Sequence, residues 1–414
     1  MSTKTSFDFM VLGGGGRGSL FSRWVHEHPE AGRVVAVAEV RPERRKAIAE
    51  MHCIKPELQF EHWEDALSRP KLADAILNGL MDKFHAPSAL QALPKGYHML
   101  LEKPMATTLE DCVAIDAARR KNNCIVAVCH TMRYLAAYAE VKRLVDRGAI
   151  GRVVCFGQVE GVGAVHQSHS FVRGNWGNST RATFMLLSKS CHDLDILSYL
   201  IGKPCRRVSS FGNLSYFNRA NTPAGAPARC TDGCPHEMEC TYAAQKIYLS
   251  DDLGWARHAN ICGTRVERLE QLKTSPYGRC VYQCDNDVVD HQVVNMEFET
   301  GVTGTFTMTA FLKGHRHLRL HGTEGSLYLD LEGNTIEIFR YKDEATELIK
   351  IPPQSGSHGG GDSNILHAFV NALRQNDPNA VLTGTAESLE SHRIVFAAEK
   401  SRQEGRTVEL AELR

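Results

Sequence analysis

The sequence predicts an α/β domain built on a doubly wound parallel sheet, followed by a larger domain that also contains sheet strands. A strand, a glycine-rich turn and a helix open the chain, and apolar strands then alternate with helical stretches through the first third. The chain has 414 residues, of which 43% are hydrophobic, and this is enough to bury the cores of two domains. We therefore expect a globular α/β protein.

The charge balance points to a small ligand. Basic and acidic side chains number 48 each, so the formal net charge is zero, which argues against whole-chain attraction to nucleic acid or to an anionic membrane surface. No apolar run approaches the roughly 20 residues of a membrane-spanning helix, and Met1–Thr5 leads into a strand without a signal segment, so we expect a cytoplasmic protein. Thirteen cysteines cannot all pair within one chain, which favours thiols or a metal site over disulfides.

The first expected strand, Phe7–Leu12, runs directly into a glycine-rich turn. Gly13, Gly15 and Gly18 have the G-x-G-x-x-G spacing, and residues 20–28 follow with helical periodicity. In a dinucleotide-binding turn the first glycine permits the bend, the second lets the backbone approach the pyrophosphate, and the third lets helix and strand pack closely. The helix N-terminus offers free amides to the phosphates. The predicted cofactor residues of this turn are Gly13, Gly15, Gly16, Arg17 and Gly18.

Glu39 follows the second expected strand, Val34–Ala38, and lies 21 residues beyond Gly18. An acid at this spacing accepts hydrogen bonds from the hydroxyls of an adenosine ribose. Its carboxylate would repel a 2′-phosphate, so the sequence favours NAD over NADP, although Arg41 and Arg44 nearby could accommodate a phosphate. The alternative is that Glu39 is a solvated loop acid and that the glycines form only a tight turn.

Further apolar strands and helices complete the expected parallel sheet. Thr107 and Glu110 have the spacing of a capping box, which predicts the start of a helix. Ligands bind outside the carboxyl ends of the strands in such sheets, and Glu102-Lys103-Pro104 lies at one of these ends. Lys103 could exchange a proton with an alcohol there, whereas a lone lysine after a strand is more often a surface charge. The expected strands are 75–80, 97–101 and 125–129, with a short helical stretch at 88–93.

Glu102-Lys103-Pro104 and the glycine turn together resemble the Gfo/Idh/MocA family, the relatives of glucose-fructose oxidoreductase and inositol dehydrogenase. The resemblance extends over nearly the whole chain, including 78–85, 130–134, 148–153 and the closing helices from Asp362. It implies an NAD-binding Rossmann domain and then a domain with an open, mainly antiparallel sheet, which holds substrate and often makes the oligomer contact. A sugar, polyol or sugar derivative is the implied substrate, and a homodimer or homotetramer is the implied assembly.

On this resemblance we place the Rossmann domain at 1–130 and the substrate domain at 131–414. The second domain then includes a Cys-rich insertion near 222–285 and ends in the closing helices. These sizes are ordinary for single folding units.

The resemblance also assigns the site residues. The family's lysine corresponds to Lys103, and its H-x-x-D helix corresponds to His192–Asp195. Many dehydrogenases of the family place an aspartate four residues before that histidine, but this chain has Ser188 followed by Lys189. We therefore expect His192 to act as base, Lys103 to polarise the alcohol oxygen, and Lys189 to bind a hydroxyl or an anionic substituent. The alternative for His192 is a core histidine paired with Asp195 on the same helix face. The resemblance adds Asn78, His85 and Glu102 to the cofactor site, and Arg133 and Asp195 to the substrate site.

Residues 161–176 are expected to form a loop that supplies substrate contacts. His166, His169, Arg173 and Trp176 combine hydrogen-bonding groups with an apolar ring face, which is the mixture that a carbohydrate requires. The alternative is a mobile polar loop with one buried tryptophan. His291, beside Asp290 at the start of another expected strand, is a weaker substrate candidate, since strand ends often carry solvated polar residues.

Cys230, Cys234 and Cys240 lie in the insertion, which is rich in proline and glycine. Cys262, Cys280 and Cys284 follow within the next 50 residues. A zinc ion or another structural metal would explain this density of thiols, although the spacings of three and five intervening residues are not the usual two. The alternative is a set of reduced thiols that pack as small hydrophobic side chains.

Three functions follow from these residues. The leading prediction is an NAD-dependent oxidoreductase that removes a hydride from a secondary alcohol of a sugar, polyol or sugar derivative. A second is a glycoside hydrolase that retains NAD, oxidises a ring hydroxyl transiently, eliminates the glycosidic substituent and returns the hydride. A third is a non-catalytic protein that binds a dinucleotide as a sensor or scaffold.

Overall fold

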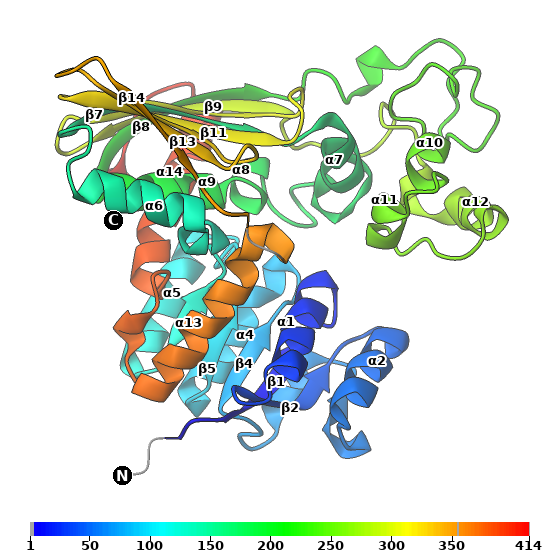
Figure 1. Cartoon of the computed structure of the whole chain (residues 1–414). Coiled ribbons are helices and arrows are strands. Elements are labelled where there is room, and N and C mark those ends of the chain that lie inside the picture. The colour runs from blue at the N-terminus through cyan, green and yellow to red at the C-terminus, as the bar shows by residue number, and fades with distance from the viewer. Residues whose placement is uncertain (1–3, 354–355, 414) are drawn as a thin grey trace.

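The computed structural model describes residues 4–353 and 356–413 and contains two β-sheets (Figure 1). The first sheet has the strand order β3-β2-β1-β4-β5-β6, and all its strands are parallel. The order reverses between β1 and β4, and ligands of such sheets bind at the carboxyl ends beside the reversal. The predicted doubly wound sheet is confirmed. Its strands are β1 (Phe7–Leu12), β2 (Gly32–Ala38), β3 (Gln59–Phe60), β4 (Ala75–Asn78), β5 (His98–Leu101) and β6 (Val126–Val128).

Helices cover both faces of the first sheet (Figure 1). On one face α1 and α2 bury their apolar residues, and α13 completes that layer although it follows the second sheet in the chain. On the other face lie α3, α4 and α5. Their bounds are α1 (Gly16–Glu27), α2 (Pro42–His52), α3 (Trp63–Ser68), α4 (His85–Ala92), α5 (Leu109–Lys121) and α13 (Gly361–Gln375). Within 4–353 and 356–413, no helix combines the length and apolarity needed to cross a bilayer.

The second sheet has the order β14-β13-β12-β11-β7-β10-β9-β8-β15 and is antiparallel except between β7 and β10. The open, mainly antiparallel sheet is thus also confirmed. One face is covered by α6 (Ala136–Asp146), α8 (Met185–Ser188), α9 (Cys191–Ile201) and α14 (Thr385–Glu404) (Figure 1). The strands are β7 (Val153–Gly161), β8 (Cys205–Asn213), β9 (His291–Phe298), β10 (Thr303–Thr309), β11 (His315–Gly322), β12 (Gly325–Asp330), β13 (Thr335–Arg340), β14 (Thr346–Lys350) and β15 (Val408–Glu409).

Two local predictions are wrong. Helix α5 is capped by Thr108, whose hydroxyl accepts a hydrogen bond from the Asp111 amide at 3.1 Å, and not by Thr107. Residues 161–176 form short helical turns, namely α7 (Ala164–Ser168) and a π-helical turn His169–Arg173, instead of a loop. This segment is largely buried because it lies between the second sheet and the insertion, and burial requires its backbone groups to be paired.

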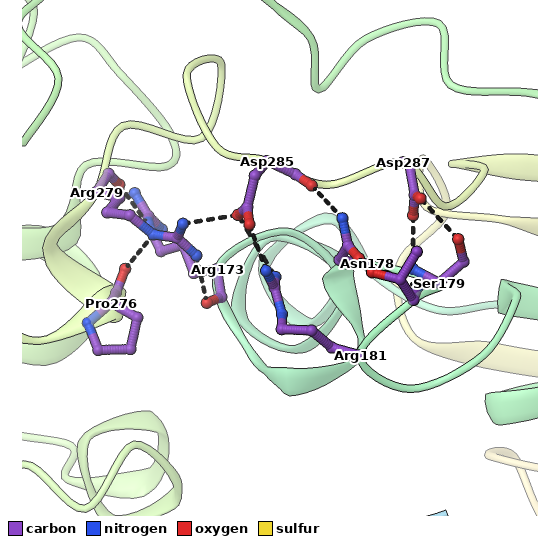
Figure 2. A network of polar contacts seen from close by, with 9 residues as sticks. Arg173, Asn178, Ser179, Arg181, Pro276, Arg279, Asp285 and Asp287 are labelled. Carbon is purple, nitrogen blue, oxygen red and sulfur yellow. Dashed lines mark hydrogen bonds and ion pairs between the residues drawn. The ribbon is translucent and has the colours of Figure 1, made fainter. Parts of the chain in front are cut away.

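The insertion forms a lobe beside α7, with α10 (Ala244–Tyr248), α11 (Gly254–His258) and α12 (Arg265–Thr274) around a small apolar core of its own (Figure 1). A polar network fixes its end to the segment after the π-helical turn (Figure 2). Asp285 accepts hydrogen bonds from Arg181 and, at 2.7 Å, from Arg279. Asp287 accepts from the Ser179 amide at 2.7 Å. Arg279 also donates to the Arg173 carbonyl at 2.9 Å, which holds the lobe to the segment that the sequence singles out for substrate contacts.

Candidate functional site

A cleft of about 870 Å³ lies between the two sheets, at the carboxyl ends of β1, β4 and β5. This volume falls in the upper part of the range of roughly 300–1,000 Å³ found for ligand pockets. The cleft collects residues from the glycine turn, from the end of β5, and from α7 and α9. The predicted site residues that line it are Gly15, Gly16, Arg17, Glu102, Lys103, His166, His169, Trp176, Lys189 and His192.

The glycines of the turn divide into a structural set and a ligand-facing set. Gly13 has φ +81°, and a Cβ on Gly18 would lie 1.8 Å from the Gly13 carbonyl oxygen, so these two positions require glycine. Gly15 and Gly16 face the cleft instead. A Cβ on Gly15 would meet nothing closer than Arg44 Nη1 at 3.7 Å, and one on Gly16 nothing within 4 Å. The space that these side chains would fill is open to a phosphate group.

Helix α1 and Glu39 complete a seat that fits a dinucleotide. No side chain caps α1 and its first turn has no acidic residue, so its amides are available to phosphate. The Glu39 carboxylate, at the end of β2, accepts hydrogen bonds from the Gly14 amide at 2.5 Å and the Arg41 amide at 2.9 Å. Each oxygen retains a further acceptor site for a ribose hydroxyl. An acid at this place favours NAD over NADP.

Arg17 links three distant parts of the chain at the edge of the cleft. Its Nε donates to Glu102 at 2.5 Å, and its two Nη atoms donate to Asp362 at 2.9 and 2.7 Å. Burial opposes the charge of Arg17, but the two carboxylates outweigh this effect and raise its pKa. The cation therefore holds α13 and the end of β5 against the start of α1.

Lys103 is held in the cleft by α8. Its Nζ donates to the main-chain carbonyl of Ser188 at 2.6 Å. An ammonium group has three donors, so two remain for other partners. Ser188 is the position at which the sequence departs from the family's common aspartate, and here its backbone, not its side chain, contacts the lysine.

Lys189 belongs to a buried cluster of charges behind the cleft. Its Nζ lies 2.9 Å from Glu160, and Arg316 lies 2.7 Å from Glu160 and 3.0 Å from Asp193. Burial lowers the pKa of Lys189, an effect that Glu160 opposes, and burial raises the pKa of Asp193. Lys189 and Arg316 also line the cleft.

His192 is the cleft-lining member of a row of three histidines. Its ring is edge-on to that of His130 at 5.8 Å, and His130 is edge-on to His392 at 5.5 Å. Burial lowers the pKa of His130 and lowers that of His392 to about 3, so both are neutral near pH 7. The two histidines next to His192 in this row therefore carry no positive charge near pH 7.

Rings from residues 166–176 and from the insertion line one side of the cleft, which we call the aromatic wall: His166, His169, Trp176, Trp255 and Tyr277. His169 stacks on Tyr277 at 4.6 Å and lies 4.8 Å from Trp255. Trp176 donates to Asp82 at 3.1 Å, which ties the wall to the loop after β4. Burial lowers the pKa of His166 to about 3 and that of His169 to about 4, so the wall is uncharged near neutral pH.

Two family models account for most of the chain. A model described as an oxidoreductase family with an NAD-binding Rossmann fold matches residues 7–130, and one described as the C-terminal alpha/beta domain of that family matches residues 142–410. The chain belongs to the Gfo/Idh/MocA family. It is therefore an NAD-binding oxidoreductase, as the glycine turn and Lys103 predict.

Three relatives are similar to this chain at low identity. YteT of Bacillus subtilis (strain 168), named as an oxidoreductase, is 22% identical over 325 residues, or 73% of each chain. The scyllo-inositol 2-dehydrogenase (NAD(+)) of the same organism is 28% identical over 163 residues, which is 38% of this chain and 45% of that protein. A levoglucosan dehydrogenase in complex with NADH and L-sorbose superposes with a TM-score of 0.74 at 19% identity, covering 98% of this chain and 99% of the other. This last likeness shows the shared fold.

Several predicted substrate residues of this Gfo/Idh/MocA protein do not line the cleft. Arg133 and Asp195 form a buried ion pair with two hydrogen bonds of 2.7 Å. Arg173 is buried beside the insertion, where its Nε donates to the Arg279 carbonyl at 2.7 Å. His291 lies 2.8 Å from Asp290 at the start of β9. These side chains therefore bind other parts of the protein and do not face the cleft.

Some predicted cofactor residues shape the seat without facing it. Asn78 donates to Ser88 at 2.8 Å, and the ring nitrogens of His85 lie 2.7 Å from the Pro104 carbonyl oxygen and 3.0 Å from that of Leu80. His85 thereby joins the loops after β4 and β5. Arg41 is exposed and contributes its amide to Glu39.

The sequence missed Trp255, Tyr277 and Arg316, all of which line the cleft. The first two lie in the insertion, where Trp255, its one tryptophan, was the available signal, whereas Tyr277 is one of four tyrosines there. Arg316 follows the alternation of an ordinary strand, and only its place opposite Glu160 gives it a role.

The structure does not support the predicted zinc ion. Thiolates bound to one zinc at about 2.3 Å would bring their sulfur atoms within about 4.6 Å of one another. Across residues 4–353 and 356–413, the one set of three or more candidate ligand atoms within 4.8 Å of one another is His315, Asp330 and Glu332. The thiols of Cys230, Cys234 and Cys240 do not form that geometry.

Proposed function

We propose that this protein is an NAD-dependent dehydrogenase that oxidises a secondary alcohol of a sugar, polyol or sugar derivative. The observation that carries the proposal is the convergence of Lys103, Lys189 and His192 on the cleft that the glycine turn opens. Bound NAD supplies the hydride acceptor. The residues of the chain must then bind the alcohol, polarise its oxygen and take up its proton.

Lys103 donates to the alcohol oxygen with one of the donors that Ser188 leaves available, and the charge stabilises the developing alkoxide. His192 takes the hydroxyl proton while the carbon–hydrogen bond breaks and the hydride leaves. Lys189 holds a neighbouring hydroxyl, and Glu160 at 2.9 Å fixes its ammonium group in place. The opposite direction of reaction uses the same groups in reverse.

The aromatic wall supports a carbohydrate or cyclitol as substrate. Sugar rings present an apolar face beside hydroxyl groups. Flat uncharged aromatic rings can pack against such a face without requiring a charged group on the substrate. The names of the relatives, an inositol dehydrogenase and a levoglucosan dehydrogenase, agree with that class. A homo-oligomer and a cytoplasmic location remain predictions, to be tested by light scattering and by cell fractionation.

A panel of monosaccharides and cyclitols, read by NADH absorbance, tests the proposal. We expect turnover with NAD and at least one panel member, and a fall of about 10²- to 10⁴-fold in kcat for Lys103→Met. Lys83→Met is the matched control, because Lys83 is exposed on the loop after β4 and does not line the cleft. Equal kcat in Lys103→Met and wild type would remove Lys103 from the reaction. Tight NADH binding without turnover of any substrate would favour a non-catalytic sensor.

A second candidate is the NAD-retaining glycoside hydrolase, which the main-chain contact of Ser188 and the added Lys189 favour. With a lysine in place of the common arrangement, the cleft holds two amine groups for the proton transfers of an elimination and of the addition of water that follows it. Release of the aglycone from aryl glycosides without net NADH, together with entry of solvent deuterium beside the oxidised carbon, would identify it. Net NADH formation without deuterium entry would exclude it.

A further inference from the structure

Three cations line the cleft together with the aromatic wall: Lys103, Lys189 and Arg316. The carboxylates that pair with two of them, Glu160 and Asp193, do not line it. The Lys189 and Arg316 side chains are 16% and 19% exposed, whereas those of Glu160 and Asp193 are 3% and 0% exposed. The cluster therefore presents its positive groups to the cleft and keeps its negative groups in the interior.

The charges of this cluster do not balance within the protein. Glu160 pairs with Lys189 at 2.9 Å and with Arg316 at 2.7 Å, and Asp193 pairs with Arg316 at 3.0 Å. Lys103 donates to a main-chain carbonyl, which carries no net charge. Three cations against two carboxylates leave one positive charge. A cation that is largely removed from water is costly unless an anion compensates it.

The ring of His166 lies in the field of all three cations. Burial lowers the pKa of His166 most, and Lys189, Lys103 and Arg316 lower it further. No carboxylate is among the strongest influences on this pKa. The aromatic wall and the three cations therefore enclose a region of positive potential.

Three carboxylates also line the cleft, but each has another partner: Asp82, Glu102 and Glu332. Arg17 binds Glu102 at 2.5 Å. Asp82 accepts a hydrogen bond from the aromatic wall at 3.1 Å, and Glu332 lies 3.1 Å from His315. Over the described residues, none of these carboxylates forms an ion pair with one of the three cations. They therefore do not supply the missing partner.

Arg316 has the donors that a carboxylate needs. Its Nε and Nη2 donate to Asp193 at 3.0 and 3.5 Å. Its Nη1 has no hydrogen-bond partner in 4–353 or 356–413, the part of the chain that the structure describes. Guanidinium and carboxylate groups pair through parallel, charge-assisted hydrogen bonds. Arg316 can therefore bind one further carboxylate without giving up Asp193.

We propose that the substrate is an acidic sugar whose carboxylate pairs with Arg316, in the field of Lys103 and Lys189. The inference rests on the proposed dehydrogenase and narrows its substrate class. One carboxylate supplies the single negative charge that the cluster lacks, and a neutral sugar supplies none. A phosphate ester carries nearly two negative charges at neutral pH and exceeds the balance. Lys103 still binds the reacting oxygen, and Lys189 still binds a neighbouring hydroxyl.

The test compares sugars that differ only in the group at one terminal carbon. D-Glucuronate is compared with D-glucose and D-glucose 6-phosphate, D-galacturonate with D-galactose and D-galactose 6-phosphate, and D-gluconate with D-glucose as its open-chain acid. A charged hydrogen bond is worth about 10- to 150-fold, so at least one acid should exceed its neutral partner in kcat/KM by that factor.

Turnover of neutral sugars with no preference for the acids would overturn the inference and leave the proposed function standing. A preference for the phosphates would also overturn it. Absence of any turnover counts against the proposed function instead, and the Kd of each sugar for the NADH complex then decides the inference by fluorescence. Acids that bind no more tightly than their neutral partners would refute it.

Variants of Arg316 show whether this residue sets the preference. Arg316→Gln should lower the ratio of kcat/KM for acid over neutral sugar about tenfold or more. Both sugars are measured on the same sample, so a loss of folded protein cancels in the ratio. Arg316→Lys keeps the charge beside Glu160 and Asp193 and should fold even where Arg316→Gln does not. It should also lower the ratio, because lysine lacks the planar fork.

Arg319→Gln is the matched control, because Arg319 lies on the same strand, β11, is exposed and does not line the cleft. Its ratio should equal that of the wild type. A wild-type ratio in every folded variant of Arg316 would remove Arg316 from substrate recognition and overturn the inference.

Discussion

Replacing Gly15 with alanine should weaken dinucleotide binding without unfolding the protein. Gly15 has φ −67°, which any residue adopts, and its Cβ would meet nothing closer than Arg44 Nη1 at 3.7 Å. The methyl group should therefore change the free energy of unfolding by no more than about 0.5 kcal/mol. It would fill the space through which a phosphate reaches the amides of α1. One lost hydrogen bond to a charged group is worth about 1.5–3 kcal/mol, so the Kd for NADH should rise about 10- to 150-fold.

Gly18→Ala should do the opposite. Its Cβ would lie 1.8 Å from the Gly13 carbonyl oxygen, which is backbone and cannot rotate away. Forcing a methyl group into packed surroundings costs about 1–3 kcal/mol or more. The urea midpoint should fall. Any change in the Kd for NADH should come only from distortion of the glycine turn.

Fluorescence titration with NADH and urea unfolding measure the two effects on the same samples. Gly157→Ala is a control for the added methyl group, because its Cβ would meet nothing within 4 Å and Gly157, on β7, does not line the cleft. Wild-type affinity in Gly15→Ala would show that the turn is not the phosphate seat, and the reasoning would fail.

Three other perturbations test the walls of the cleft. Asp195→Asn should lower the free energy of unfolding by about 3–5 kcal/mol by leaving Arg133 buried and unpaired, as urea unfolding would measure; a large rise in KM at unchanged stability would instead assign Asp195 to the substrate. Stability should also fall as the pH drops below 6.5. The unfolded chain then takes up protons that His166, His169 and His392, with pKa values of about 3, 4 and 3, do not, and each costs about 1.4 kcal/mol per pH unit. A urea midpoint that stays constant from neutral to mildly acidic pH would contradict this. Trp255→Ala should raise the KM for a sugar about 2- to 12-fold through the loss of about 0.5–1.5 kcal/mol of ring contact, while Tyr341→Ala, an exposed ring outside the cleft, should leave it unchanged. Unaltered KM in Trp255→Ala would remove the insertion from substrate binding.

The sequence predicts best what is decided locally. The glycine turn, its flanking strand and helix, and Lys103 at a strand end all depend on residues within a few positions of one another, and the structure places each as expected. Thr108 replaces Thr107 as helix cap because two adjacent threonines satisfy the same pattern, and only the path of the backbone decides between them.

Contacts between distant residues could not be predicted in the same way. Arg133 and Asp195 are both plausible substrate ligands until the fold pairs them across 62 positions. Arg173 donates to carbonyl groups of the insertion and does not line the cleft, whereas Trp255 of the insertion does line it. Polar side chains in a sequence show that a site can exist, but the partner that each one finds is set by packing over the whole chain.

The bridge from Arg17 to Asp362 has a consequence for how the protein is made. The dinucleotide seat is encoded in the first hundred residues. However, Arg17 and one face of the first sheet lack their partners until α13 has been synthesised, more than 300 residues later. Until then the nascent domain exposes the apolar side chains around Phe9, Trp24 and Val25. A chain that stops before residue 361 therefore carries every glycine of the turn and still lacks a finished NAD site, so this protein should mature only after synthesis is nearly complete.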